Sequence, residues 1–342
     1  MADAPTNCID EDSKPVKLAD LAALAGVSTA TVSRALAGHS SVNAQTSERI
    51  RALAREHDVR PNQLARNLRL KSTGAIGLVL PLGHARTQHL TDPFFVSLLG
   101  FLADLLVEHG YDILLSRVIP DADDWLERVV DSGRIDGLLL VGQSNQFAVI
   151  DRVAQRYRPL VVWGAHRPDQ HHLTIGSDNV AGGRMAAEHL IASGRKRLLF
   201  VGDPAPPEFA DRLVGFAAAA RDAGVAHDVL ATPMMPEAVH AAVARHVTGG
   251  TVPDAIFAAS DVAAMSVLRA LAEAGIDVPG TTAVIGYDDV TLAAHTSPSL
   301  TTIRQDLALG AGMMVDRLLK RIAGESAESA IVPPVLIKRQ SA

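Results

Sequence analysis

Apolar positions near the start of the chain recur at helical spacing. Leu18, Leu21, Ala22 and Ala25 lie three or four residues apart, which predicts a short amphipathic helix over residues 17–25. Glycine follows this helix, and Ser28 is a favourable N-cap for a second helix. The second helix should run to about Ala37, and a third is expected from Asn43 to His57, with Ile50, Leu53 and Ala54 facing inward. Two helices joined by a tight turn and braced by a third predict an all-α helix-turn-helix head over residues 14–60.

The pattern changes after residue 73, where short apolar runs alternate with amphipathic stretches. The runs predicted to be buried strands are 74–81, 111–118, 136–142, 159–164, 196–203, 254–260 and 282–289. Alternation of this kind predicts an α/β body of parallel, doubly wound sheets with helices on both faces. Two series of strands predict two lobes within residues 74–342. We expect the N-lobe at about 74–191 and 304–329, the C-lobe at about 192–303 and 330–340, and a ligand cleft where the strands' carboxyl ends face each other.

Residues 61–71, PNQLARNLRLK, lie between head and body and predict a short helix. Pro61 suits a helix start, and Leu64 and Leu68 share one face. The segment is shorter than the ~12 to 15 residues at which an isolated helix becomes marginally stable in water. It therefore needs a partner in order to fold, or else it is a plain interdomain linker.

Charge is distributed unevenly along the chain. The 342 residues have a net charge of −6, yet residues 14–71 contain ten Lys or Arg against four Asp or Glu. A basic head joined to an acidic body is the expected electrostatic pattern of a phosphate-binding module attached to a part that does not touch nucleic acid. The alternative interpretation of the basic head is a surface that contacts only solvent.

The second predicted helix has the side chains that major-groove recognition requires. Arg34 can donate two hydrogen bonds to guanine O6 and N7, and Ala30 and the Thr29 methyl suit thymine methyl groups. Ser28, Thr31 and the free N–H groups of the helix start would hold phosphates. The alternative is a small-residue helix packed inside an α/β domain.

The stretch KPVKLADLAALAGVSTATVSRAL, residues 14–36, resembles the opening of the lactose-repressor/galactose-repressor (LacI) family. This resemblance implies that Thr29, Ala30 and Arg34 read bases and that Ser28, Thr31 and Ser33 position the helix. It also implies that residues 61–71 form a hinge helix paired with its twin from a second subunit. In that helix Asn62 and Leu68 would contact DNA, with Leu68 as an apolar wedge in the minor groove.

The same resemblance extends to the body, whose lobes are similar to type I periplasmic sugar-binding proteins. Polar side chains at the predicted strand ends occupy positions that commonly contact the effector in this family, and Ser260 stands where many members have Asn. In the DPFF segment and at the end of another strand, aromatic rings could stack on a sugar. The expected effector residues are Phe94, Phe95, Trp163, Asp178, Arg212, Ser260, Asp288 and Gln305. For each polar residue the alternative is a loop cap or a lobe-closing contact, and for each ring it is the core.

Other functional classes find little support in the sequence. It contains no Gly-x-Ser-x-Gly elbow, phosphate loop, His-Glu-x-x-His motif or Gly-x-Gly-x-x-Gly after a strand, so we expect no enzyme and no cofactor. Cys8 is the only cysteine, which excludes a disulfide within the chain and a thiolate metal cluster. The segment HRPDQHH, residues 166–172, is expected to be a surface loop and no metal site. No apolar run approaches ~18 residues and no secretory signal is present, so a cytoplasmic protein with no membrane contact is expected.

These observations lead to one interpretation: a homodimeric transcriptional regulator, expected to repress carbohydrate-utilisation genes. It should bind near-palindromic operator DNA and respond to a mono- or disaccharide, with a preference for α-glucoside or maltose-type sugars. The chain ends without a leucine-heptad extension, which favours a dimer. The competing interpretation is a sugar-binding protein of the periplasmic type without a DNA function.

Overall fold

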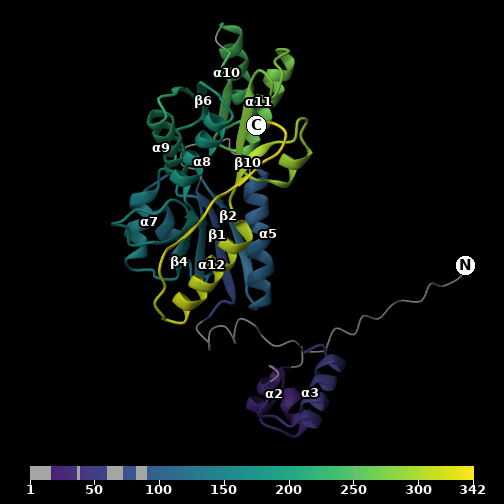
Figure 1. The fold of residues 1–342 in the computed structure, drawn as a ribbon. Helices are drawn as coiled ribbons and strands as arrows, with labels where there is room; N and C mark the ends of the chain where they lie inside the picture. The colour runs from purple at the N-terminus through teal and green to yellow at the C-terminus, as the bar shows by residue number, and fades with distance from the viewer. Residues whose placement is uncertain (1–16, 37–38, 60–71, 82–90, 251) are drawn as a thin grey trace, which may run out of the picture. The chain divides into compact units, whose positions relative to one another are not determined.

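A computed structural model describes residues 17–36, 39–59, 72–81, 91–250 and 252–342. The chain divides into two compact units, residues 1–73 and 74–342 (Figure 1). The predicted hinge helix, with Asn62 and Leu68, lies outside the described residues. Among the described helices, none has the length and apolar character needed to cross a membrane.

The first unit contains the predicted helix-turn-helix. Its helices are α1 (Leu18–Ala25), α2 (Thr29–Leu36) and α3 (Ala44–Glu56). Gly26 ends α1 in the left-handed conformation, at φ 63°, which glycine adopts without steric cost. Asn43 caps α3 by accepting a hydrogen bond from the Gln45 N–H at 2.8 Å. Leu21, Val32 and Ile50, one from each helix, are fully buried together, so the predicted apolar stripes meet in one small core.

Two doubly wound lobes make up the second unit, as the strand and helix alternation predicts. The first sheet has the order β11 (Ala330–Val332), β5 (Leu173–Ser177), β4 (Leu160–Trp163), β3 (Gly137–Val141), β1 (Ala75–Pro81) and β2 (Asp112–Val118), all parallel. On one face it is covered by α5 (Pro93–Glu108) and α12 (Leu307–Ile322), and on the other by α6 (Trp125–Val130) and α7 (Phe147–Ala154). Both faces of the central strands are therefore buried, which explains why β3 and β4 are continuous apolar runs.

The second lobe repeats this arrangement. Its sheet has the order β12 (Val335–Ile337), β10 (Thr301–Arg304), β9 (Ala283–Asp288), β8 (Ala255–Ala258), β6 (Arg197–Gly202) and β7 (Ala226–Ala231), with only β12 antiparallel among these described strands. One face is covered by α10 (Pro236–Thr248) and α11 (Asp261–Glu273), the other by α8 (Asn179–Ala192) and α9 (Pro207–Asp222). A short 3₁₀ helix, Thr291–His295, follows β9.

Helices α8 and α9 pack with their backbones in contact, and Figure 1 shows them side by side in teal. A Cβ atom on Gly183 would overlap the backbone oxygen of Arg212, and one on Gly215 would overlap that of Val180. Glycine is therefore required at both positions, because any side chain would force the helices apart.

The lobe assignments differ from the expected boundaries in two places. Helix α8 was expected at the end of the N-lobe, but Ala186, Ala187 and Leu190 pack in the core of the second sheet. Residues from 330 onward were expected in the C-lobe, but β11 pairs with β5 of the first sheet. The chain thus crosses between lobes near Asp178, near Gln305 and between β11 and β12.

Several elements were not expected from the sequence. Strands β5, β7, β10, β11 and β12 were not predicted, and β7 and the last two have exposed or half-buried positions that weaken the apolar pattern. Asp178 and Arg212, both expected at strand ends, are the N-cap of α8 and a residue within α9.

Candidate DNA interface and effector site

The predicted recognition helix α2 turns its small and polar side chains outward. Ser28 accepts a hydrogen bond from the Thr31 N–H at 3.1 Å, which is the predicted N-cap interaction. Thr29, Ala30 and Arg34 are exposed, while Val32 and Ala35 on the opposite side are buried. The exposed positions are those expected to read bases, so the helix is able to approach a DNA groove closely.

The base-reading candidate Arg34 is exposed and contacts its own helix. Its Nε donates to the Ala30 carbonyl oxygen at 3.3 Å. Beside it, Thr31 and Ser33 are half-buried at the helix surface. Arg49 of α3 donates through Nη2 to the Ala25 carbonyl at 2.5 Å and so fixes α3 to the end of α1. This contact stabilises the angle at which α2 is presented.

In the body, the predicted effector residue Arg212 is at the centre of a buried polar cluster. Its Nε donates to Asn179 Oδ1 at 2.9 Å, and Nη1 donates to the carbonyl oxygen of Ala259. Its guanidinium carbon lies 3.6 Å from the centroid of the Tyr287 ring, a cation–π arrangement. Its Nη2 lies 3.8 Å from Asp288 Oδ1. Arg212 is thus held by α8, β9 and the segment after β8.

Asp288 and Gln305 are brought together, as expected. Gln305 Nε2 donates to Asp288 Oδ1 at 2.7 Å, and both side chains are buried. Asp288 has a φ of 117° and Asp289 a φ of 58°, a region that side chains other than glycine rarely adopt. Two strained residues in succession at the end of β9 mark this turn as a candidate functional position.

The pKa of Asp288 is raised from 3.8 to about 7, chiefly by burial and to a lesser extent by the Asp92 carboxylate. The Arg212 guanidinium and the Gln305 amide act in the opposite direction by stabilising the charged form. Asp92 begins α5 in the first lobe, where its side chain accepts from the Phe94 N–H at 2.9 Å, and burial raises its pKa too. Carboxyl groups from both lobes therefore influence one another.

Two other expected effector residues act as helix caps. Asp178 accepts from the Ala181 N–H at 2.9 Å and begins α8, and Ser260 accepts from the Ala263 N–H at 3.2 Å and begins α11. A cap is one of the alternative roles that the sequence allows for Asp178 and Ser260. Each residue still lies at a strand-to-helix junction of the kind where α/β sheets bind ligands.

The three expected aromatic residues form one group in the first lobe. The ring centroids of Phe94 and Phe95 are 5.3 Å apart, and those of Phe94 and Trp163 are 6.1 Å apart. Trp163 is buried in the core, and a Cβ atom on Gly310 of α12 would overlap its ring. Phe94 and Phe95 are half-buried and so remain the better candidates for stacking on a ligand.

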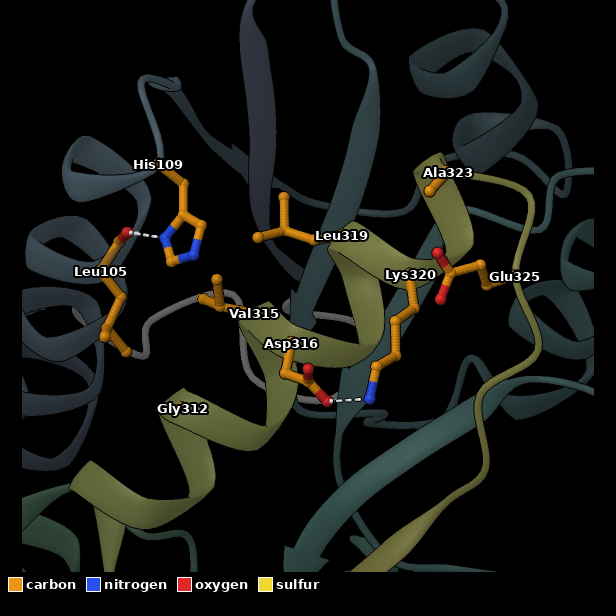
Figure 2. A pocket seen from close by; sticks show the side chains of 9 residues that line it. All are labelled: Leu105, His109, Gly312, Val315, Asp316, Leu319, Lys320, Ala323 and Glu325. Atoms are coloured by element: carbon orange, nitrogen blue, oxygen red, sulfur yellow. Dashed lines mark hydrogen bonds and ion pairs between the residues drawn. The ribbon is translucent and has the colours of Figure 1, made fainter.

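The grooves in the described part of the body include two with different linings. One, of about 410 Å³, lies between α5 of the first lobe and the ends of β9 and β10, and its lining includes Asp288 and Gln305. The other, of about 310 Å³, lies between the end of α5 and α12, where Figure 2 shows Leu105 and His109 facing Val315 and Leu319. The residues lining this second groove include none of the expected effector residues.

Some residues of the cluster were not expected from the sequence. Asn179 and Tyr287 hold Arg212, and the buried Asp261 accepts hydrogen bonds from Thr302 Oγ1 at 2.6 Å and from the Val290 N–H at 2.9 Å. Asn179, Asp261 and Tyr287 are each next in sequence to an expected effector residue, which is the signal that could have identified them. Burial raises the pKa of Asp261 well above its usual value.

The segment 166–172 is only partly the surface loop that was expected. His172 is buried and shares the Asp151 carboxylate with His171, at Nδ1–O distances of 2.9 and 2.7 Å. In the described part of the chain, no group of three or more His, Cys, Asp or Glu is placed to hold a metal ion. The histidines therefore have a structural role in anchoring the loop.

The pKa of Asp288 leads to a prediction about stability and pH. Because its pKa is higher in the folded state than the usual 3.8, the folded protein binds a proton that the unfolded chain releases. The free energy of unfolding should therefore fall as the pH rises from about 4 through about 7, and Asp288→Asn should flatten this dependence. Urea unfolding of both proteins at a series of pH values measures the difference; parallel curves would contradict the assignment.

Comparison with known proteins gives two matches to protein families. The lacI family of bacterial regulatory proteins matches residues 17–62, and the periplasmic binding protein-like domain matches residues 187–342. The ribose operon repressor of Escherichia coli (strain K12) is 30% identical over 342 residues, covering 94% of this chain and 98% of that protein.

Solved structures agree with these matches. The lac repressor dimer bound to operator and the anti-inducer ONPF superposes with a TM-score of 0.82 at 26% identity, covering 96% of this chain and 99% of the other. The complex of the transcriptional regulator CelR with cellobiose has a TM-score of 0.70 at 28% identity, covering 96% and 100%. With a helix-turn-helix head, a two-lobe body and similarity along almost its whole length, this chain belongs to the lacI family of bacterial regulatory proteins.

Proposed function

We propose that this protein is a sequence-specific repressor of carbohydrate-utilisation genes, controlled by a sugar bound between the lobes of its body. The observation that supports it most is α2, whose exposed Thr29, Ala30 and Arg34 follow a capped helix start. A periplasmic-type sugar-binding protein has no use for such a helix. Similarity to the ribose operon repressor and to the lac repressor on its operator favours the same function.

The effector is expected to contact Arg212, Asp288 and Gln305. Buried carboxylate, amide and guanidinium groups that meet where two lobes face each other can donate to and accept from the vicinal hydroxyls of a sugar. A sugar regulates DNA binding only if it has different affinities for two arrangements of the lobes. CelR binds cellobiose in its solved complex, and we keep α-glucosides of the maltose type as the first class to test here.

The protein acts as a homodimer in this proposal, with α5 and β2 of the first lobe at the interface. On α5, Val96, Phe101 and Val107 are 52%, 42% and 67% exposed, and Leu115 on β2 is 44% exposed. Strand β2 is the edge of its sheet and contacts α5, so these exposed apolar side chains lie on two adjacent elements of the first lobe. A second copy that covers them would bring two heads to the two half-sites of a near-palindrome.

Selection of duplexes from a random pool by the full-length protein, repeated with mono- and disaccharides present, tests the proposal. We expect one near-palindromic sequence to be enriched and one sugar to change its retention. A thermal-shift measurement with the same sugars checks that the sugar binds the protein itself. Absence of any preferred duplex at physiological salt, with and without sugars, would refute the function.

Arg34→Ala should weaken binding to the selected operator by about 1–3 kcal/mol and relax the preference at one base pair. The side chain lies on the exposed face of α2, so its loss should leave the fold of the head intact. Fluorescence anisotropy against operator and scrambled duplexes measures both effects. Arg51→Ala on α3 is a control of equal charge; equal losses on both duplexes for Arg34→Ala would show a phosphate contact instead of base reading.

A further inference from the structure

An ion pair joins the two lobes and involves none of the residues proposed to contact the effector. Arg167 lies in the loop between β4 and β5 of the first lobe, and Asp211 lies on α9 of the second. Arg167 Nη1 and Nη2 donate to the two carboxylate oxygens of Asp211 at 2.9 and 3.0 Å. Two parallel hydrogen bonds of this kind fix both the distance and the orientation of the two elements.

The loop that presents Arg167 is held rigidly to the first lobe. Asp151 on α7 accepts hydrogen bonds from the backbone N–H and the Nδ1 of both His171 and His172, at 2.5–3.2 Å. Gln170 accepts from the Arg167 N–H at 2.7 Å and donates to Thr174 Oγ1 at 2.9 Å. The backbone of Arg167 is therefore fixed to the first lobe, and its side chain connects that lobe to Asp211 of the second lobe.

The other end of the pair is next to the polar cluster. Asp211 precedes Arg212 on α9, whose side chain is fixed by Asn179 and stacks on Tyr287. One turn earlier, Glu208 adds a second contact between lobes, because the Ala165 N–H of the first lobe stabilises its carboxylate. Both contacts form only when the Ala165–Arg167 segment lies against the start of α9.

We propose that Arg167 and Asp211 form a latch that stabilises the closed arrangement of the two lobes and so positions α9, with Arg212, over the cleft. They are positioning residues, since neither belongs to the proposed effector contacts. The Arg167 side chain is 39% exposed and that of Asp211 is 19% exposed, so solvent weakens the pair. Its loss should shift the ratio of closed to open lobes by about three- to tenfold, a large change for a two-state equilibrium and a small one for overall stability.

Distances between the lobes test the latch without any ligand. Nitroxide labels would be placed at Ser132→Cys in the first lobe and Glu237→Cys in the second, both exposed positions, in a Cys8→Ser background. Double electron–electron resonance on the full chain, diluted with excess unlabelled chain, gives the distance distribution within one protomer. Arg167→Ala and Asp211→Asn should each move population toward a longer distance by the expected ratio.

Two further variants make the result specific. The charge exchange Arg167→Asp with Asp211→Arg should restore the parent distribution, because the pair is re-formed with reversed polarity. Arg152→Ala removes an ion pair with Glu127 at 2.9 Å that lies wholly within the first lobe, and it should leave the distribution unchanged. Unchanged distances in both single variants, or an exchange variant no closer to the parent than the singles, would overturn the latch. The outcome is independent of the DNA and sugar proposals, since neither ligand is present.

Discussion

Arg212→Ala should abolish the response to effector and lower the free energy of unfolding of the body by about 3 kcal/mol. The guanidinium is 4% exposed and donates to Asn179 and to the Ala259 carbonyl. Its removal leaves two buried acceptors unpaired and withdraws the nearest positive charge from Asp288. Buried groups without partners cost more than the hydrogen bonds themselves contribute.

Urea unfolding measures the stability loss, and operator release by the sugar identified in the screen measures the response. Arg184→Ala is the matched control, because Arg184 on the neighbouring α8 makes ion pairs at the exposed surface with Asp222 and Glu188. That change should leave both the free energy of unfolding and the response close to those of the parent, because solvent screens an exposed ion pair. Arg212→Lys should retain part of the stability but not the response, since lysine lacks the planar fork. A variant Arg212→Ala that still releases operator with sugar would place the effector elsewhere.

Phe101→Glu should convert the protein to a monomer and weaken operator binding by about 10² to 10⁴-fold. Phe101 is 42% exposed and lines the groove that includes Asp288, whereas Leu98, Leu102 and Leu106 form the buried side of α5, so a charge at Phe101 leaves the core of the first lobe intact. Two heads on one dimer bind the second half-site as an intramolecular event, and a monomer loses that advantage.

Sedimentation of the parent and variant measures the oligomeric state, and anisotropy on whole and half operators measures the affinity. Val214→Glu on α9 is the control, because Val214 is 55% exposed on the other lobe, away from α5. The variant and the parent should bind a half operator equally. A Phe101→Glu protein that remains dimeric would show that α5 is not the interface.

The elements that could be predicted from the sequence are those determined by residues close to one another in the chain. The spacing of Leu21, Val32 and Ile50, and the caps Ser28 and Asn43, are enough to define the three helices of the head. In the body, strands made mostly of apolar residues, such as β3 and β4, were predicted, whereas the buried β5 and β10 were missed because Thr, Ser or Arg interrupts their apolar runs. Strand β7, at the edge of its sheet, has exposed positions that remove this signal.

Other features depend on contacts between distant parts of the chain. Arg212 could be identified by resemblance, but its acceptors Asn179 and Ala259 come from different elements, and no periodicity predicts their meeting. His172 lies in a polar segment and was expected at the surface, whereas Asp151, on α7, makes its burial possible. The lobe membership of α8 depends on its packing against α9, which the spacing of strands does not reveal.

That packing limits how the site can adapt to other ligands. Gly183 contacts the backbone of Arg212, and Gly215 contacts the backbone of Val180. Helices α8 and α9 therefore form one rigid unit. Arg212 and the residues that begin α8 therefore keep their relative positions when the two lobes move. If the proposed effector site is correct, a change of ligand preference should therefore arise from side chains of the first lobe, such as Phe94 and Phe95.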